Sequence, residues 1–100
     1  MKRRFIIGVS GLNKEDQDKF VEFLRQNGMG WWHWIGDCWL LTARKEEISA
    51  SMIRDFLNEL NSTRRCIVFE VDEDKTWAGF GPNKAPQDMF DWIKNSWRGD

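Results

Sequence analysis

The residues of this chain that could carry acid–base, nucleophilic or metal chemistry are few and scattered. His33 is the only histidine, and Cys38 and Cys66 are the only cysteines. These three residues lack the short spacings that hold a zinc ion. The serines have no base partner that the sequence reveals, so nucleophilic catalysis has no support. We therefore expect no catalytic residue, no metal site and no cofactor.

Carboxylates are the remaining source of metal chemistry. Glu70, Asp72, Glu73 and Asp74 follow an apolar run, and Asp37 lies in a Gly-Asp turn. A charge run of this kind is usually a solvated face. Carboxylate oxygens are also the ligands that Mg²⁺ prefers. A metal-dependent ribonuclease built on Asp37 or Asp72 therefore stays open as an alternative function.

Four arginines are the candidate nucleic-acid-binding residues: Arg3, Arg4, Arg64 and Arg65. They lie at the starts of two predicted strands, and neighbouring strands would gather them into a phosphate-binding stripe. The same charges also suit an ordinary solvated edge that resists aggregation. The formal net charge of −1 argues against a strongly basic nucleic-acid module but allows a local basic patch.

Four of the seven tryptophans lie within twelve residues, on both sides of Gly36-Asp37. This pattern predicts a β-hairpin with a two-residue turn. In that register Trp34 faces Trp39 and Trp32 faces Leu41, so all four share one face. We expect core or dimer packing rather than base stacking, because no Lys or Arg accompanies the aromatic residues between Met29 and Thr42.

The other elements follow from periodicity and capping. Strands are expected at Arg4 to Val9, in the two arms of the hairpin, and at Arg65 to Val71. Helices are expected at Lys14 to Asn27 and from Ser49 to about Asn61, with Asn13 and Ser49 as N-caps. This order predicts an α+β, ferredoxin-like βαββαβ fold: an antiparallel sheet of order 4-1-3-2 with both helices on one face.

One hundred residues predict a single domain, with a core at about 4–72 and a C-terminal extension at about 73–100. Trp77 to Pro82 predicts a short edge strand and a loop, and Pro86 predicts the first turn of a last helix. That helix would cover the open sheet face or reach a neighbouring subunit.

The location of the protein is predicted from three observations. No apolar run approaches the roughly 20 residues of a membrane span, and the apolar stretch after Lys2-Arg3-Arg4 is too short for a signal sequence. The two cysteines lie in apolar strand patterns, which is typical of buried thiols in a reducing compartment. We expect a cytoplasmic protein without a membrane partner.

The signature Trp31-Trp32-His33, followed by Trp39-Leu40, resembles the SinR-like family of small bacterial proteins. The start of the second helix, the strand Ile67 to Val71 and the late Trp77-x-Gly79-Phe80 share this resemblance, which runs from about Phe5 to Trp97. The family is related to the small ferredoxin-like adaptation subunit of CRISPR systems. The resemblance implies a homodimer formed near the C-terminus, which places Trp77 and Phe80 at the interface with the fourth strand.

Nuclease relatives of this family hold a divalent metal with an aspartate at the end of the first strand. Ser10 and Gly11 stand at that place here. We therefore expect a non-catalytic nucleic-acid- or protein-binding module of a mobile-element or defence setting. Two alternatives remain: a metal-dependent ribonuclease with a rebuilt site, and a structural partner that docks on another protein through its aromatic face.

Overall fold

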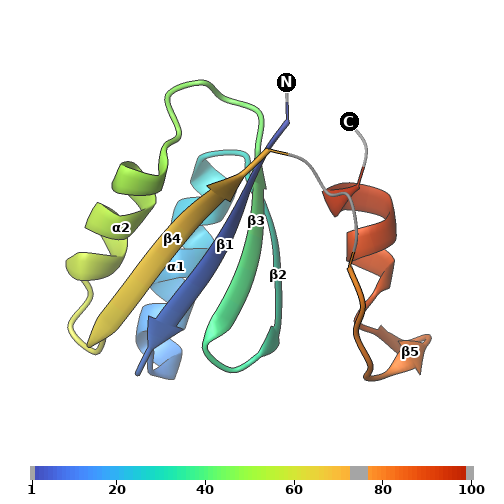
Figure 1. The fold of residues 1–100 in the computed structure, drawn as a ribbon. Helices are drawn as coiled ribbons and strands as arrows, with labels where there is room; N and C mark the ends of the chain where they lie inside the picture. The colour runs from blue at the N-terminus through green and yellow to red at the C-terminus, as the bar shows by residue number, and fades with distance from the viewer. Residues whose placement is uncertain (1, 73–76, 99–100) are drawn as a thin grey trace.

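A computed structural model describes residues 2–72 and 77–98 (Figure 1). Its main part is an antiparallel four-stranded sheet with two α-helices. The strands are β1 (Arg3–Ser10), β2 (Gly30–Ile35), β3 (Cys38–Ala43) and β4 (Arg65–Val71), and the helices are α1 (Lys14–Gln26) and α2 (Ala50–Asn58). The strand order is β2-β3-β1-β4, so β2 and β4 form the two edges. The predicted α+β class, antiparallel sheet and two helices are confirmed.

Local signals set the ends of both helices. The side chain of Asn13 accepts a hydrogen bond from the backbone N–H of Asp16, and Ser49 does the same for Met52. These bonds satisfy helix N–H groups that have no partner inside the helix. Gly28, just beyond α1, has a φ of +66°, a conformation that glycine adopts without steric cost.

The inner face of the sheet and the two helices enclose the main core. Phe5 and Ile7 of β1 and Leu41 of β3 are fully buried against α1 and α2. The ring of Phe20 meets Trp39 edge-on, with centroids 4.9 Å apart. Because β1 and β3 occupy the middle of the sheet, their inward side chains contribute most to this core.

The hairpin departs from the predicted register. Ile35 pairs with Cys38 as expected, but Trp32 pairs with Leu40 and Trp31 with Leu41, because a bulge lies between Trp32 and Ile35. A shift of one residue moves side chains to the opposite face. The prediction that Trp32 shares a face with Trp39 is therefore wrong. Trp31 packs against the main core, whereas Trp32 lies on the outer face.

The C-terminal segment differs from the expected strand and helix. It forms two short strands, β5 (Asn83–Lys84) and β6 (Gln87–Asp88), and a π-helical turn, η1 (Ile93–Trp97). Residues 77–80 form no strand, and Pro86 lies in the turn between β5 and β6 rather than in a helix. A proline with its fixed φ suits a turn as well as a first helical turn. Residues 73–76 and 99–100 of the predicted extension lie outside the described residues.

Candidate interaction surface on the outer sheet face

The outer face of the sheet, opposite the helices, carries apolar side chains on all four strands. Ile6 of β1 pairs with Leu40 on one side and with Phe69 on the other. Leu40 in turn pairs with Trp32, which completes one row across the sheet. In the next row, Gly8 lies between Cys38 and Ile67. A sheet face of this composition needs a cover or a partner, because apolar area in contact with water is unfavourable.

The C-terminal segment covers the part of this face near β2 and β3. A second cluster joins Trp32 to four side chains of that segment, namely Met89, Phe90, Ile93 and Trp97. The indole N–H of Trp32 donates to the carbonyl of Met89 at 2.6 Å. In Figure 1 the segment stands beyond β2, well apart from the two helices.

Two cations near the N-terminus hold the end of the C-terminal segment. The Nε of Arg4 donates to the carbonyl of Trp97 at 2.6 Å, and Lys2 donates to the carbonyls of Ser96 and Arg98. Lys2 and Arg4 are buried in this arrangement. Charge-assisted hydrogen bonds to carbonyl groups offset the cost of burying these cations.

The rest of the outer face, beside β4, stays in contact with solvent. Ile6 is 36% exposed, and Ile67 and Phe69 are each 56% exposed. We call these three residues the uncovered strip. It borders an edge strand whose residues from Cys66 to Val71 include neither lysine nor proline, the residues that commonly protect such edges. The sequence carried a signal for this surface, since the strand from Arg65 to Val71 is apolar on both faces.

The four candidate arginines do not form one stripe. β1 and β4 run antiparallel, so Arg4 lies opposite Val71 while Arg65 lies opposite Ser10. The two pairs of arginines are therefore about 20 Å apart, at opposite ends of the strands. The expectation that they gather on one edge assumed that neighbouring strands bring their starts together, which only parallel strands do.

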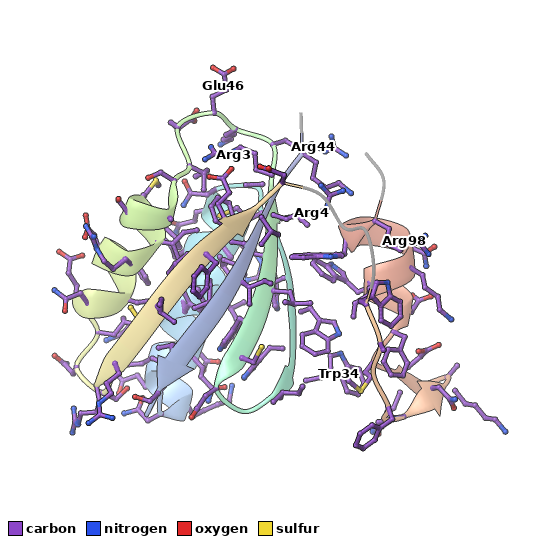
Figure 2. All side chains as sticks on the ribbon, in the orientation of Figure 1. Arg3, Arg4, Trp34, Arg44, Glu46 and Arg98 are labelled. Atoms are coloured by element: carbon purple, nitrogen blue, oxygen red, sulfur yellow. The ribbon has the colours of Figure 1, made fainter. Side chains whose placement is uncertain are left out.

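Arg3 and Arg4 are engaged in holding the fold. Arg3 forms two hydrogen bonds with the carboxylate of Glu70, at 2.8 and 2.9 Å, and also donates to the carbonyls of Glu46 and Ile48. This contact lowers the pKa of Glu70 and raises the pKa of Arg3. Figure 2 shows Arg3 close to the loop that carries Glu46 and Arg4 beside the C-terminal segment.

Arg64 and Arg65 are exposed at the other end of the sheet. The Nη1 of Arg64 lies 3.4 Å from the carbonyl of Asn61. Arg65 lines a shallow pocket together with Asp37 of the hairpin turn. These two arginines remain available for an electrostatic contact with a partner.

The residues of the tryptophan signature have different surroundings. Trp39 is buried in the main core, and the ring of His33 stacks on it with centroids 3.8 Å apart. The Nε2–H of His33 donates to the carbonyl of Gly36 at 2.7 Å, which braces the hairpin turn. Trp31 is half-buried, with the guanidinium of Arg25 5.9 Å from its ring centre. Trp34, outside the signature, is 43% exposed.

The carboxylates of the ribonuclease alternative are not brought together. Asp37 lies in the hairpin turn, where its carbonyl accepts from the backbone N–H of Val9. Asp72 follows β4 at the opposite end of the sheet, where its carbonyl accepts from Arg4. Within residues 2–72 and 77–98, no three side chains among His, Cys, Asp and Glu gather as a metal-binding group.

Trp77 and Phe80 lie against the hairpin and not beside β4. Trp77 stacks on Phe90 with centroids 5.7 Å apart, and both Trp77 and Phe80 line a groove with Trp34. Phe80 is 94% exposed. The two parts of the expected dimer surface, β4 and Trp77 with Phe80, are therefore separated by the width of the sheet (Figure 1).

No family model, curated protein or solved structure matches this chain. In the part of the chain that the structure describes, no helix has the length and apolar character required to cross a membrane.

Proposed function

We propose that this protein is a non-catalytic protein-interaction module that acts as a homodimer joined through β4. The observation that carries the proposal is the uncovered strip of Ile6, Ile67 and Phe69 beside an edge strand. Read from that edge, the strand order is 4-1-3-2. This order supports placing the domain among ferredoxin-like folds, and the resemblance to SinR-like proteins belongs to the same proposal.

A second copy is the occupant that best fits the charges along β4. The cationic residues Arg64 and Arg65 lie at the start of the strand, and the acidic residues Glu70 and Asp72 lie at its end. Antiparallel pairing of two β4 strands about Val68 sets Ile67 against Phe69 of the second copy. The same register sets Arg64 against Asp72 of the second copy, twice by symmetry. Opposite charges and apolar side chains directly across a strand pair both stabilise it.

This dimer would join two sheets into one of eight strands. Its uncovered strips would become continuous across the two-fold axis, which removes apolar area from water. A single strand edge and three apolar side chains make a small interface. We therefore expect association in the weak range that is typical of interfaces below about 1,200 Å².

Sedimentation equilibrium of the purified protein, from about 10 µM to about 1 mM, tests the proposal. We expect a concentration-dependent dimer that Phe69→Lys weakens, because a charged lysine would replace the apolar contact with Ile67 of the second copy across the strand pair. Phe80→Ser is the matched control, since Phe80 is an exposed aromatic residue distant from β4, and it should leave the dimer intact.

A charge exchange identifies the register. Arg64→Asp alone and Asp72→Arg alone should each weaken the dimer, since each places like charges opposite one another. The double variant Arg64→Asp/Asp72→Arg restores opposite charges and should recover the association of the natural protein. A monomer throughout the concentration range would overturn the homodimer. A dimer that Phe69→Lys leaves unchanged would overturn the role of β4.

A second candidate function is binding of single-stranded nucleic acid. Exposed Arg64 and Arg65 lie at the end of the sheet where the hairpin turns, and exposed Trp34 lies in that hairpin. Phosphate-binding arginines and exposed aromatic rings are the usual elements of such a surface. Here Trp34 in β2 and Arg65 in β4 lie on opposite edges of the sheet, so a bound strand would have to cross it. A mobility-shift gel with labelled RNA and DNA, with Mg²⁺ or chelator, should show a salt-sensitive shift without cleavage.

Arg65→Gln sharpens this second candidate. In the proposed dimer Arg65 faces Val71 of the second copy, so its charge contributes little to self-association. If Arg65 binds phosphate, the substitution should reduce the slope of log affinity against log salt by about one. An unchanged slope would remove Arg65 from a phosphate site, and chelator-sensitive cleavage would favour a ribonuclease.

We place the module in the cytoplasm and in a mobile-element or defence setting.

A further inference from the structure

A groove lies between the hairpin and the C-terminal segment, on the opposite side of the molecule from the β4 edge. Its volume is about 880 Å³, within the roughly 300–1,000 Å³ typical of small-molecule sites. One wall is the hairpin of β2 and β3. The other wall is the loop from Trp77 to Pro82 together with the part of the C-terminal segment that follows it. Figure 2 shows Trp34 in the space between these two parts.

The lining of the groove is apolar and rich in aromatic rings. Five aromatic side chains contribute to it: Trp32, Trp34, Trp77, Phe80 and Phe90. None of the described residues that line it carries a charged side chain. An anion would lose its hydration here without gaining an ion-pair partner, and a cation would regain only part of that cost from the faces of the aromatic rings, so the lining favours an uncharged occupant.

Hydrogen bonds and tight packing hold both walls in place without a ligand. The indole N–H of Trp32 donates to the carbonyl of Met89, which ties the C-terminal segment to the hairpin. The backbone N–H of Met89 donates to the carbonyl of Pro82 at 2.9 Å, which closes the loop. A Cβ on Gly79 would lie 3.1 Å from the ring of Phe90, so the loop runs directly over that ring.

Because Trp32 already donates to Met89, its indole N–H is not available to a ligand. Among the described side chains that line the groove, the indole groups of Trp34 and Trp77 and the thiol of Cys38 can also form polar contacts. Burial raises the pKa of this thiol, which keeps it in the neutral form. Rings stacked or tilted against the aromatic walls would gain the contacts that such walls prefer.

We propose that this groove binds a small, uncharged, planar aromatic molecule. The site is independent of the β4 edge, since neither Ile67 nor Phe69 lines it. The proposal therefore goes beyond the homodimer and does not depend on it. The exposed rings of Trp34 and Phe80 lie at the solvent-facing side of the groove.

Three naphthalene derivatives of equal size test the charge selectivity: 2-naphthylmethanol, 2-naphthoate and 2-naphthylmethylammonium. We expect saturable binding of the alcohol in calorimetry, with the two ions weaker by about tenfold or more. In NMR spectra of the same titration, the indole N–H signals of Trp34 and Trp77 should shift. The amide signals of Ile67 and Phe69 should stay in place.

Trp34→Ser should weaken binding of the alcohol at least about tenfold while the protein stays folded, because Trp34 is half-exposed. Phe69→Ser is the matched control and should leave binding unchanged. Ala78→Leu should also weaken binding, since a larger side chain at that lining position fills the groove without removing a contact.

No binding of the alcohol up to its solubility limit would overturn the proposal. Equal binding of all three compounds would also overturn it, as would shifts confined to the uncovered strip. These outcomes are separate from those of the sedimentation experiments. A monomeric protein that binds the alcohol would refute the homodimer alone, and a dimer that does not bind it would refute the groove alone.

Discussion

The two faces of the main sheet differ in how completely other parts of the chain cover them. On the inner face, Phe5, Ile7 and Leu41 are completely covered by the two helices. On the outer face, the C-terminal segment covers Trp32 but leaves Ile67 and Phe69 in water. Both faces are apolar, so composition alone does not distinguish them. The difference shows that the helices provide a complete cover, whereas the C-terminal segment leaves apolar area for a partner.

The largest expected effect tests this comparison at two adjacent residues of β1. Ile7 is fully buried on the inner face, and Ile6 is 36% exposed on the outer face. Ile7→Ala should lower the free energy of unfolding by about 2–5 kcal/mol. Ile6→Ala should lower it by less than about 1 kcal/mol. Urea unfolding of both variants at low protein concentration measures the difference. Equal losses would show that the outer face is covered in solution.

A smaller, local effect is expected where the C-terminal segment covers the outer face. Ile93→Ala removes part of the second cluster and should weaken the attachment of the segment by about 2 kcal/mol. Hydrogen exchange should then accelerate across the C-terminal segment, while the amides of β1 and β3 keep their protection. Uniform acceleration through the whole chain would mean that segment and sheet unfold as one unit.

The pH dependence of stability tests a polar contact on the side of the sheet that the two helices cover. The carboxylate of Asp16 accepts hydrogen bonds from the backbone N–H of Ser62, at 2.8 Å, and from the Ser62 hydroxyl. These bonds lower the pKa of Asp16 below its ordinary value of 3.8. The stability they add is therefore fully present above that value and is lost as the pH falls through the lowered pKa.

Thermal unfolding between pH 7 and pH 2 measures this contribution. Asp16→Asn should lower the melting temperature at neutral pH and should flatten its decline below pH 4. Glu15→Gln is the control, because Glu15 is exposed on the same helix and its carboxylate lies 3.6 Å from the Nζ of Lys19. A decline that is equally steep in Asp16→Asn would assign the acid sensitivity to other carboxylates.

The smallest effect is expected for the ion pair between Arg3 and Glu70. Both side chains are partly exposed, so Glu70→Gln should cost no more than about 1 kcal/mol. Part of this cost should vanish in high salt, which screens exposed charges. Chemical unfolding in low and high salt provides the comparison. A larger, salt-independent cost would show that Arg3 is essential for holding the loop at Glu46 and Ile48.

Much of the fold could be predicted because its signals are local. Asn13 and Ser49 cap the helices, Gly28 follows α1, and Gly36-Asp37 turns the hairpin, as expected. The hairpin register could not be predicted, because a bulge between Trp32 and Ile35 depends on contacts across the whole sheet. Pro86 was misplaced because a fixed φ suits turns and helix starts alike.

The sequence predicted only part of the candidate site. Arg64 and Arg65 are exposed as expected, but Arg3 binds Glu70, and Arg4 is buried and donates to the carbonyl of Trp97. The sequence analysis placed the fourth strand at a dimer interface but did not single out Ile67 and Phe69, whose side chains lie exposed on the outer face of the sheet.

By itself, the sequence determined the two helices, the four strands of the main sheet and the hairpin turn, because caps, glycines and alternating side chains act over a few residues. The tertiary structure alone decided which face each tryptophan occupies, which arginines are engaged and which apolar side chains stay exposed. These outcomes depend on strand direction, on a one-residue bulge and on how far the C-terminal segment reaches. Each of these three features depends on contacts between residues far apart in the chain, so short-range sequence patterns do not predict it.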